Sequence, residues 1–211
     1  MAWMIVSDSS CEIRELESPA PGVQFALVPF KIRVGEREYV DLATLNTQQM
    51  LQAMTDYNGA STTACPSPEE WAEYFLQADN VFALTISSNL SGSYNAAQLA
   101  AEEYQQENPG KRVFVLDSLS TGPEQRLLAE HLRDLLAEGK EFDEICEEMV
   151  RYHKHTHLLF SLESLANLAR NGRVKPAVAA VARMLGIRVI GQASEAGELD
   201  VLCKTRGEHG A

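Results

Sequence analysis

Four serines stand close together in the stretch TISSNLSGSYNAAQLAAEEY, residues 85–104: Ser87, Ser88, Ser91 and Ser93. An apolar run ends just before them, and a helix of small residues is predicted from Gly92 onward. The first N–H groups of a helix have no partner within the helix and lie at the positive end of its dipole. Hydroxyls and free amides at a helix start suit an anion, such as a phosphate or a carboxylate. Any one of these serines can equally be a plain helix cap.

Polar clusters also follow other predicted strands. The clusters are Ser7-Asp8-Ser9-Ser10, Ser87-Ser88-Asn89, Asp117-Ser118 and Ser161. In open parallel sheets, ligands lie beyond the carboxyl ends of the strands. We therefore expect the four clusters to gather at one rim, facing the start of the serine-rich helix.

The elements that must position these residues alternate between strand and helix. Strands are predicted over residues 3–7, 25–28, 31–34, 39–40, 81–86, 112–116, 158–161, 187–190 and 199–204. Helices are predicted over residues 46–54, 67–78, 92–106, 121–137, 141–153, 162–169 and 175–185, and residues 56–66 are predicted to be a loop. Short strands rich in Val, Ile and Leu are typical of a parallel sheet covered by helices on both faces. We predict an N-terminal α/β domain over residues 1–155 and a smaller, incomplete second α/β domain over residues 156–211.

Composition excludes several classes of function. The net charge is −12 with no Lys/Arg stripe, which argues against nucleic-acid binding. No window approaches the ~20 apolar residues of a membrane helix, and the N-terminus reads as a strand, so we expect a cytoplasmic protein without a membrane span. The four cysteines are far apart, which indicates neither a zinc site nor a redox pair. The phosphate-loop, dinucleotide and serine-nucleophile motifs are all missing from the sequence.

The histidines His153, His155 and His157 alternate along the chain. On an extended segment their imidazoles would share one face and could bind a divalent metal. No carboxylate or cysteine stands at a ligand spacing from them, however, and a solvated strand entry is the simpler interpretation. We therefore predict no metal site and no cofactor.

Several separate stretches together carry a family resemblance. They are Ile5-Val6-Ser7-Asp8-Ser9-Ser10, Val28-Pro29-Phe30 with Tyr39-Val40-Asp41, Thr63-Ala64-Cys65-Pro66-Ser67-Pro68, Ser87-Ser88-Asn89-Leu90-Ser91-Gly92-Ser93-Tyr94, Asp117-Ser118, and Leu165, Leu168 and Asn171-Gly172-Arg173-Val174. In this order and spacing they resemble the DegV family of bacterial fatty-acid-binding proteins. The match covers nearly the whole chain, and the ordered set is more specific than any single motif.

The resemblance implies a two-domain α/β protein that holds a long-chain fatty acid between its domains. Some members present the fatty acid to a separate kinase, which makes an acyl phosphate for phospholipid synthesis, so the resemblance implies a carrier and not an enzyme. Carried over by motif, Thr63 and Ser91 would bind the carboxylate, Gly92 and Ser93 would offer backbone N–H groups, and Ser88 would support the loop. Arg173 would lie near the ligand mouth or a partner surface.

The chain departs from the family pattern in three places. It reads Thr-Ala-Cys-Pro-Ser where the family often has Thr-Ser-Gln-Pro-Ser, so Ala64 removes one hydroxyl. The second loop reads Ser-Gly-Ser-Tyr where Ser-Gly-Thr-Tyr is usual. Family members also continue beyond the residue that matches Ala211, with more of the second domain and usually a head-group histidine. We expect either a truncated form or a natural short form that needs a partner chain.

The acyl chain and the carboxylate of a fatty acid contribute differently to its binding free energy. Each buried CH₂ contributes about 0.8 kcal/mol, whereas one hydroxyl contact contributes roughly 0.5–3 kcal/mol. We therefore expect the apolar tunnel to set affinity and the head group to set orientation. Two other hypotheses stay open: an α/β enzyme that binds a small anion or phosphate with the serine-rich loop, and an interaction protein that has lost its ligand.

Overall fold

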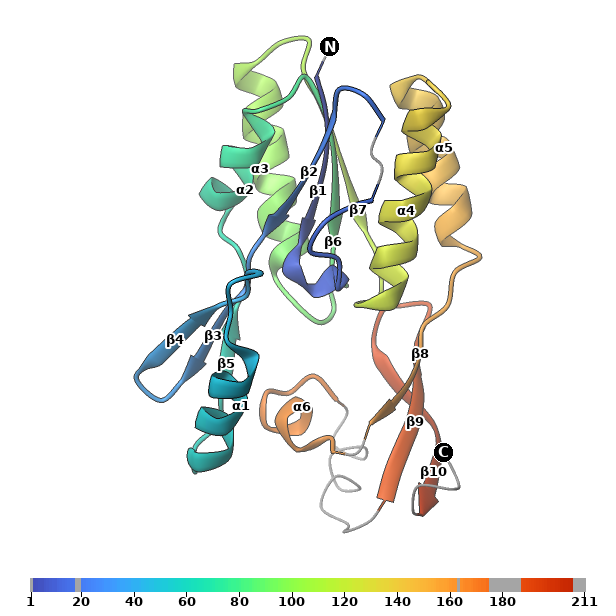
Figure 1. Cartoon of the computed structure of the whole chain (residues 1–211). Helices are drawn as coiled ribbons and strands as arrows, with labels where there is room; N and C mark the ends of the chain where they lie inside the picture. Colours follow the sequence, from blue (N-terminus) through green and yellow to red (C-terminus); the bar gives the residue numbers. More distant parts are fainter. Residues whose placement is uncertain (1, 18–19, 163, 175–186, 207–211) are drawn as a thin grey trace.

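We analysed a computed structural model of the chain, which describes residues 2–17, 20–162, 164–174 and 187–206 (Figure 1). The strands are β1 (Trp3–Asp8), β2 (Val23–Val28), β3 (Lys31–Val34), β4 (Arg37–Val40), β5 (Thr62–Ala64), β6 (Asn80–Thr85), β7 (Arg112–Asp117), β8 (Leu159–Leu162), β9 (Ile187–Ala193) and β10 (Leu199–Arg206). The helices are the short 3₁₀ turn η1 (Ser9–Cys11), α1 (Thr47–Asp56), α2 (Pro68–Phe75), α3 (Ser93–Glu107), α4 (Pro123–Ala137), α5 (Phe142–His153) and α6 (Ala166–Arg170).

The main sheet has four parallel strands in the order β2-β1-β6-β7. Helices α2 and α3 cover one face, and α4 and α5 cover the other (Figure 1). Successive side chains of β1 point to opposite faces of the sheet and so belong to two separate cores. Met4 and Val6 pack with α2 and α3, whereas Ile5 packs with α4 and α5. The predicted α/β architecture, with a parallel sheet covered on both faces, is confirmed.

A second, antiparallel sheet has the order β4-β3-β5 and lies beside α1 (Figure 1). The strands predicted over residues 31–34 and 39–40 pair with each other as a hairpin. The loop predicted over residues 56–66 is wrong for Thr62–Ala64, which form β5 and pair with β3. All three β5 residues are exposed, so the strand has no apolar alternation by which it could be recognised.

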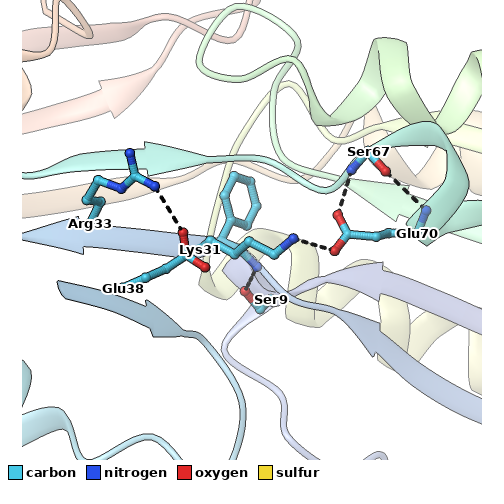
Figure 2. A network of polar contacts seen from close by, with 7 residues as sticks. Ser9, Lys31, Arg33, Glu38, Ser67 and Glu70 are labelled. Carbon is cyan, nitrogen blue, oxygen red and sulfur yellow. Dashed lines mark hydrogen bonds and ion pairs between the residues drawn. The ribbon is translucent and has the colours of Figure 1, made fainter. Parts of the chain in front are cut away.

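A polar network fixes the position of this second sheet against the main one (Figure 2). The hydroxyl of Ser9, just after β1, accepts the N–H of Phe30 at 3.0 Å. The ammonium of Lys31 lies 2.6 Å from Glu70, and Glu70 forms a capping box with Ser67 at the start of α2. The chain therefore leaves the main sheet at Phe30 with a defined direction.

The third sheet is antiparallel, with the order β10-β9-β8. Its hairpin of β9 and β10 contains the strands predicted over residues 187–190 and 199–204. The prediction that Ser161 joins the rim of the parallel sheet is wrong, because this residue lies within β8 of the third sheet. The helix predicted over 162–169 is displaced and shorter, as α6, and the one over 175–185 lies outside the described residues. The boundary at residues 155/156 stays a prediction; it falls between α5 and β8.

Candidate functional site

A cavity of about 540 Å³ is lined by residues of the second sheet, of α1, of the loop after β6, and of α6 and the turn that follows it. Its apolar wall comes from β3, α1, the loop after β6, α6 and the start of β10: Phe30, Ile32, Met50, Leu51, Met54, Ile86, Leu90, Leu168 and Leu199. Its other lining residues are Ser61, Thr63, Cys65, Ser91, Gly92, Thr121, Asn167, Asn171 and Arg173. Such a wall, mainly apolar with a few polar groups, is typical of a small-molecule site.

Strand β5 contributes every second residue to this wall. Ser61, Thr63 and Cys65 line the cavity, whereas Thr62 and Ala64 do not, as the two-residue period of a strand requires. Position 64 is therefore on the face of the strand that does not line the cavity. The hydroxyl that Ala64 lacks, compared with the family pattern, would not have lined the cavity either. The altered residue that does line it is Cys65, whose Sγ lies 3.4 Å from where a Cβ on Gly92 would be. The strand and the start of α3 thus approach each other closely.

Only one of the four clustered serines, Ser91, lines the cavity. The hydroxyl of Ser93 is buried and donates to Asp8 at 2.7 Å. Ser87 is also buried, and Ser88 supports the loop by donating its backbone N–H to Asp117 at 3.1 Å. The Oγ of Ser91 accepts the N–H of Ser93 at 3.3 Å, which leaves its own proton free to donate. Ser91 and Thr63, predicted as head-group ligands, are thus brought to the same cavity.

Asp8 holds the start of α3 in place from the end of β1. It is fully buried, and its Oδ2 accepts both the N–H of Ile86 at 2.9 Å and the hydroxyl of Ser93. Its Oδ1 accepts from Ser10 at 2.6 Å and from Gln125 at 3.1 Å. Burial raises the pKa of Asp8, against the lowering effect of these four hydrogen bonds. The polar clusters after β1, β6 and β7 therefore meet at one rim of the sheet, as predicted. Asp8 does not line the cavity at this rim; its hydrogen bonds hold the loop between β6 and α3.

The turn after α6 also lines the cavity and contacts two of its other segments. Asn171 donates to the carbonyl of Ser61 at 3.0 Å, and Arg173 donates to the carbonyl of Leu90 at 3.4 Å. This turn therefore joins the segment before β5 to the serine-rich loop. Arg173 lines the cavity and is the one charged residue among the described lining residues. Its predicted role at the ligand mouth or a partner surface stays a prediction.

Several lining residues were missed by sequence reasoning. Thr121 and Ser61 lie in loops without any motif, and Asn167 lies in α6, which is far shorter than the predicted helix. Asn171 stood within the family motif but was not singled out as a site residue. Phe30, Cys65, Leu90 and Leu168 also stood within the family motifs and line the cavity, so motif membership was the signal that could have found them.

The histidine-rich stretch does not form an extended segment. His153 is the last residue of α5, and its Nε2 lies 2.7 Å from the carbonyl oxygen of Ser118, so the shared imidazole face is wrong. His153 and His157 line a separate cavity of about 640 Å³ with Glu124 and Lys154. This larger cavity contains none of the predicted ligand residues and has a mixed charge, so the 540 Å³ cavity is the better candidate. Among the described residues, no group of three His, Cys, Asp or Glu side chains could hold a metal, and no helix is long and apolar enough to cross a bilayer.

Fold and cavity together define an α/β protein with a mainly apolar ligand site at the carboxyl end of a parallel sheet. The chain belongs to the DegV family, described as uncharacterised, whose model matches residues 2–211. The resemblance inferred from the motifs is confirmed.

Relatives of known sequence and structure agree with this assignment. The DegV domain-containing protein spr0652 of Streptococcus pneumoniae is 42% identical over 207 residues, which are 98% of this chain and 74% of that protein. The crystal structure of the Streptococcus pneumoniae Fatty Acid Kinase (Fak) B3 protein loaded with linoleic acid matches with a TM-score of 0.96 at 42% identity, over 98% of this chain and 74% of that one. A DegV family protein from Eubacterium eligens loaded with heptadecanoic acid matches with a TM-score of 0.91 at 42% identity, over 98% and 73%. This chain thus spans about three quarters of the length of these relatives.

Proposed function

We propose that this protein binds a long-chain fatty acid, with the carboxylate near Thr63, Ser91 and Gly92 and the acyl chain along the apolar wall. The observation that carries the proposal is the cavity itself, in which hydroxyls from β5 and the start of α3 meet an apolar surface. The fatty acids bound to the two relatives support it.

The head-group end offers donors that match a carboxylate. Thr63 and Ser91 each have a hydroxyl at the cavity, and Gly92 is the N-cap of α3, where backbone N–H groups and the helix dipole favour an anion. Arg173 lines the same cavity and adds a positive charge. Ser93 is buried and its backbone N–H donates to the Oγ of Ser91, so the carboxylate contact predicted for this N–H is not part of the proposal.

The acyl chain gains most of its affinity from the apolar wall. At about 0.8 kcal/mol per buried CH₂, the chain outweighs any single polar contact. Two methionines of α1, Met50 and Met54, belong to this wall. Because methionine is flexible and fills irregular space, we expect saturated and unsaturated chains to bind with similar affinity.

We further propose that the protein acts as a cytoplasmic carrier without chemistry of its own. In this role it presents the fatty acid to a fatty acid kinase, and that kinase makes the acyl phosphate. On this proposal Arg173, which lines the cavity, marks the opening through which the kinase reaches the carboxylate. With ATP and fatty acid, this protein alone should yield no acyl phosphate, and addition of a fatty acid kinase should yield it.

The alternative function, an enzyme acting on a small anion or phosphate, is not favoured. A phosphate carries nearly two negative charges, whereas Arg173 is the single cation among the described lining residues. A small anion or phosphate would also make no favourable contact with the apolar wall of this cavity. The same wall argues against an interaction protein that has lost its ligand.

Mass spectrometry of organic extracts from the purified protein tests the proposal. Co-purified acids from myristate to stearate, at close to one per chain, are the expected result. An extract without fatty acid, together with no binding of added palmitate in calorimetry, would refute it.

A further inference from the structure

The turn between β9 and β10 is docked onto the serine-rich loop that follows β6. The hydroxyl of Ser87 donates to the carbonyl of Gly197 at 2.8 Å. The side-chain amide of Asn89 donates to the carbonyl of Ala196 at 2.5 Å. Each contact joins residues more than a hundred positions apart and connects the parallel sheet to the antiparallel β8–β10 sheet.

The β9–β10 turn packs so closely against the loop after β6 that no side chain fits at Gly197. Gly197 has a φ of +76°, and a Cβ at this position would collide with the Ser87 hydroxyl and lie 2.9 Å from Leu119. The turn itself is closed by hydrogen bonds between Ser194 and both Gly197 and Glu198. Its carbonyls are therefore presented to the loop by a small, internally fixed element.

Ser87 in turn shapes the part of the loop that lines the cavity. Its carbonyl accepts the N–H groups of Leu90 at 2.9 Å and Ser91 at 3.1 Å, and its hydroxyl accepts the N–H of Asn89 at 3.2 Å. Ser87 is fully buried and does not line the cavity, so it does not touch a ligand there. Leu199, the first residue after the turn, does line the cavity beside Leu90.

We propose that Ser87 and the β9–β10 turn are positioning elements that set the carboxylate-binding geometry of Ser91 and Gly92 from the opposite sheet. By linkage, a bound carboxylate must also favour the docked turn, since a coupling between two equilibria is reciprocal. This inference rests on the proposed fatty-acid function and adds a regulatory contact to the same site.

The test compares two ligands of equal chain length, myristate and myristyl alcohol. In Ser87→Ala the contact to Gly197 is lost, so the affinity for myristate should fall about five- to tenfold, as expected for the net contribution of one hydrogen bond. The affinity for the alcohol should stay within about threefold of the wild type, because the apolar wall is retained. Asn89→Ala should show the same selective loss, and Asn95→Ala, which removes an exposed asparagine of α3, should not.

The affinities of Ser87→Ala for the two ligands decide between a positioning role and none. Equal losses for myristate and myristyl alcohol, or no loss for either, would overturn the positioning role while leaving fatty-acid binding intact. Failure of the wild type to bind myristate would refute the proposed function instead. If Ser87→Ala does not fold, as judged by its thermal unfolding, Asn89→Ala decides, because Asn89 is exposed. Amide exchange in residues 194–198 should slow with myristate and be unchanged with the alcohol; the reverse pattern would contradict the coupling.

Discussion

Removing both proposed head-group hydroxyls, in the variant Thr63→Ala with Ser91→Ala, should weaken fatty-acid binding by a calculable amount. A hydrogen bond to a charged group contributes roughly 1.5–3 kcal/mol. Thr63 is exposed and Ser91 is half-buried, so the lower value applies to both. The sum of about 3 kcal/mol corresponds to a roughly 150-fold rise in Kd. Loss of four methylenes costs about 3.2 kcal/mol, or roughly 200-fold.

The double variant should therefore bind palmitate about as weakly as the wild type binds laurate. Displacement of a fluorescent fatty acid measures both values. The matched control is Thr62→Ala with Ser88→Ala, because Thr62 does not line the cavity and alanine keeps the backbone N–H with which Ser88 contacts Asp117. Unchanged affinity in the double variant, or an equal loss in the control, would remove Thr63 and Ser91 from the site.

Two further predictions concern stability. Burial raises the pKa of Asp8, so the folded chain holds this proton more tightly than the unfolded chain, and the free energy of unfolding should fall as pH rises from about 3.9 through the raised pKa. Asp8→Asn should lack this part of the pH dependence, which urea unfolding of both proteins over a pH series measures. A difference in unfolding free energy between wild type and variant that stayed constant over this pH range would contradict the reasoning. Ser67→Ala removes the capping box of α2 and should lower the free energy of unfolding by about 1 kcal/mol. Glu70→Ala should cost at least as much, because Glu70 also pairs with Lys31, and a cost near zero for either change would argue against the cap.

The parallel sheet and its helices could be predicted because their signals are local. Runs such as Val81–Thr85 are buried throughout, and Ser67 and Glu70 specify the start of α2 within four residues. Strand β5 could not be predicted in this way, since its three exposed residues are held by pairing with β3. Its lining face, with Thr63 and Cys65, follows only once that pairing is known.

The functions of individual hydroxyls could not be read from the sequence at all. Ser87, Ser91 and Ser93 stand at the same helix start, yet one contacts Gly197, one lines the cavity and one donates to Asp8. These partners lie 85 to 110 positions away in the chain, and local sequence does not encode them. The motif match could name Thr63 and Ser91 together, but only the fold brings them to one wall.

The cysteines provide the most direct test of where the ligand lies. Cys65 lines the cavity and is half-buried, whereas Cys203 is exposed on β10 and away from it. Burial raises the pKa of Cys11 and raises that of Cys146 to about 12, so neither should react at neutral pH. Labelling with a maleimide, resolved by peptide mass spectrometry, therefore compares two thiols in one sample.

Saturating palmitate should slow the labelling of Cys65 by tenfold or more and leave the rate at Cys203 unchanged. That result would place the fatty acid in the cavity formed by β5 and the start of α3. Equal rates at Cys65 with and without bound palmitate would contradict the account, because a carboxylate between Thr63 and Ser91 must cover the sulfur that lies beside Gly92.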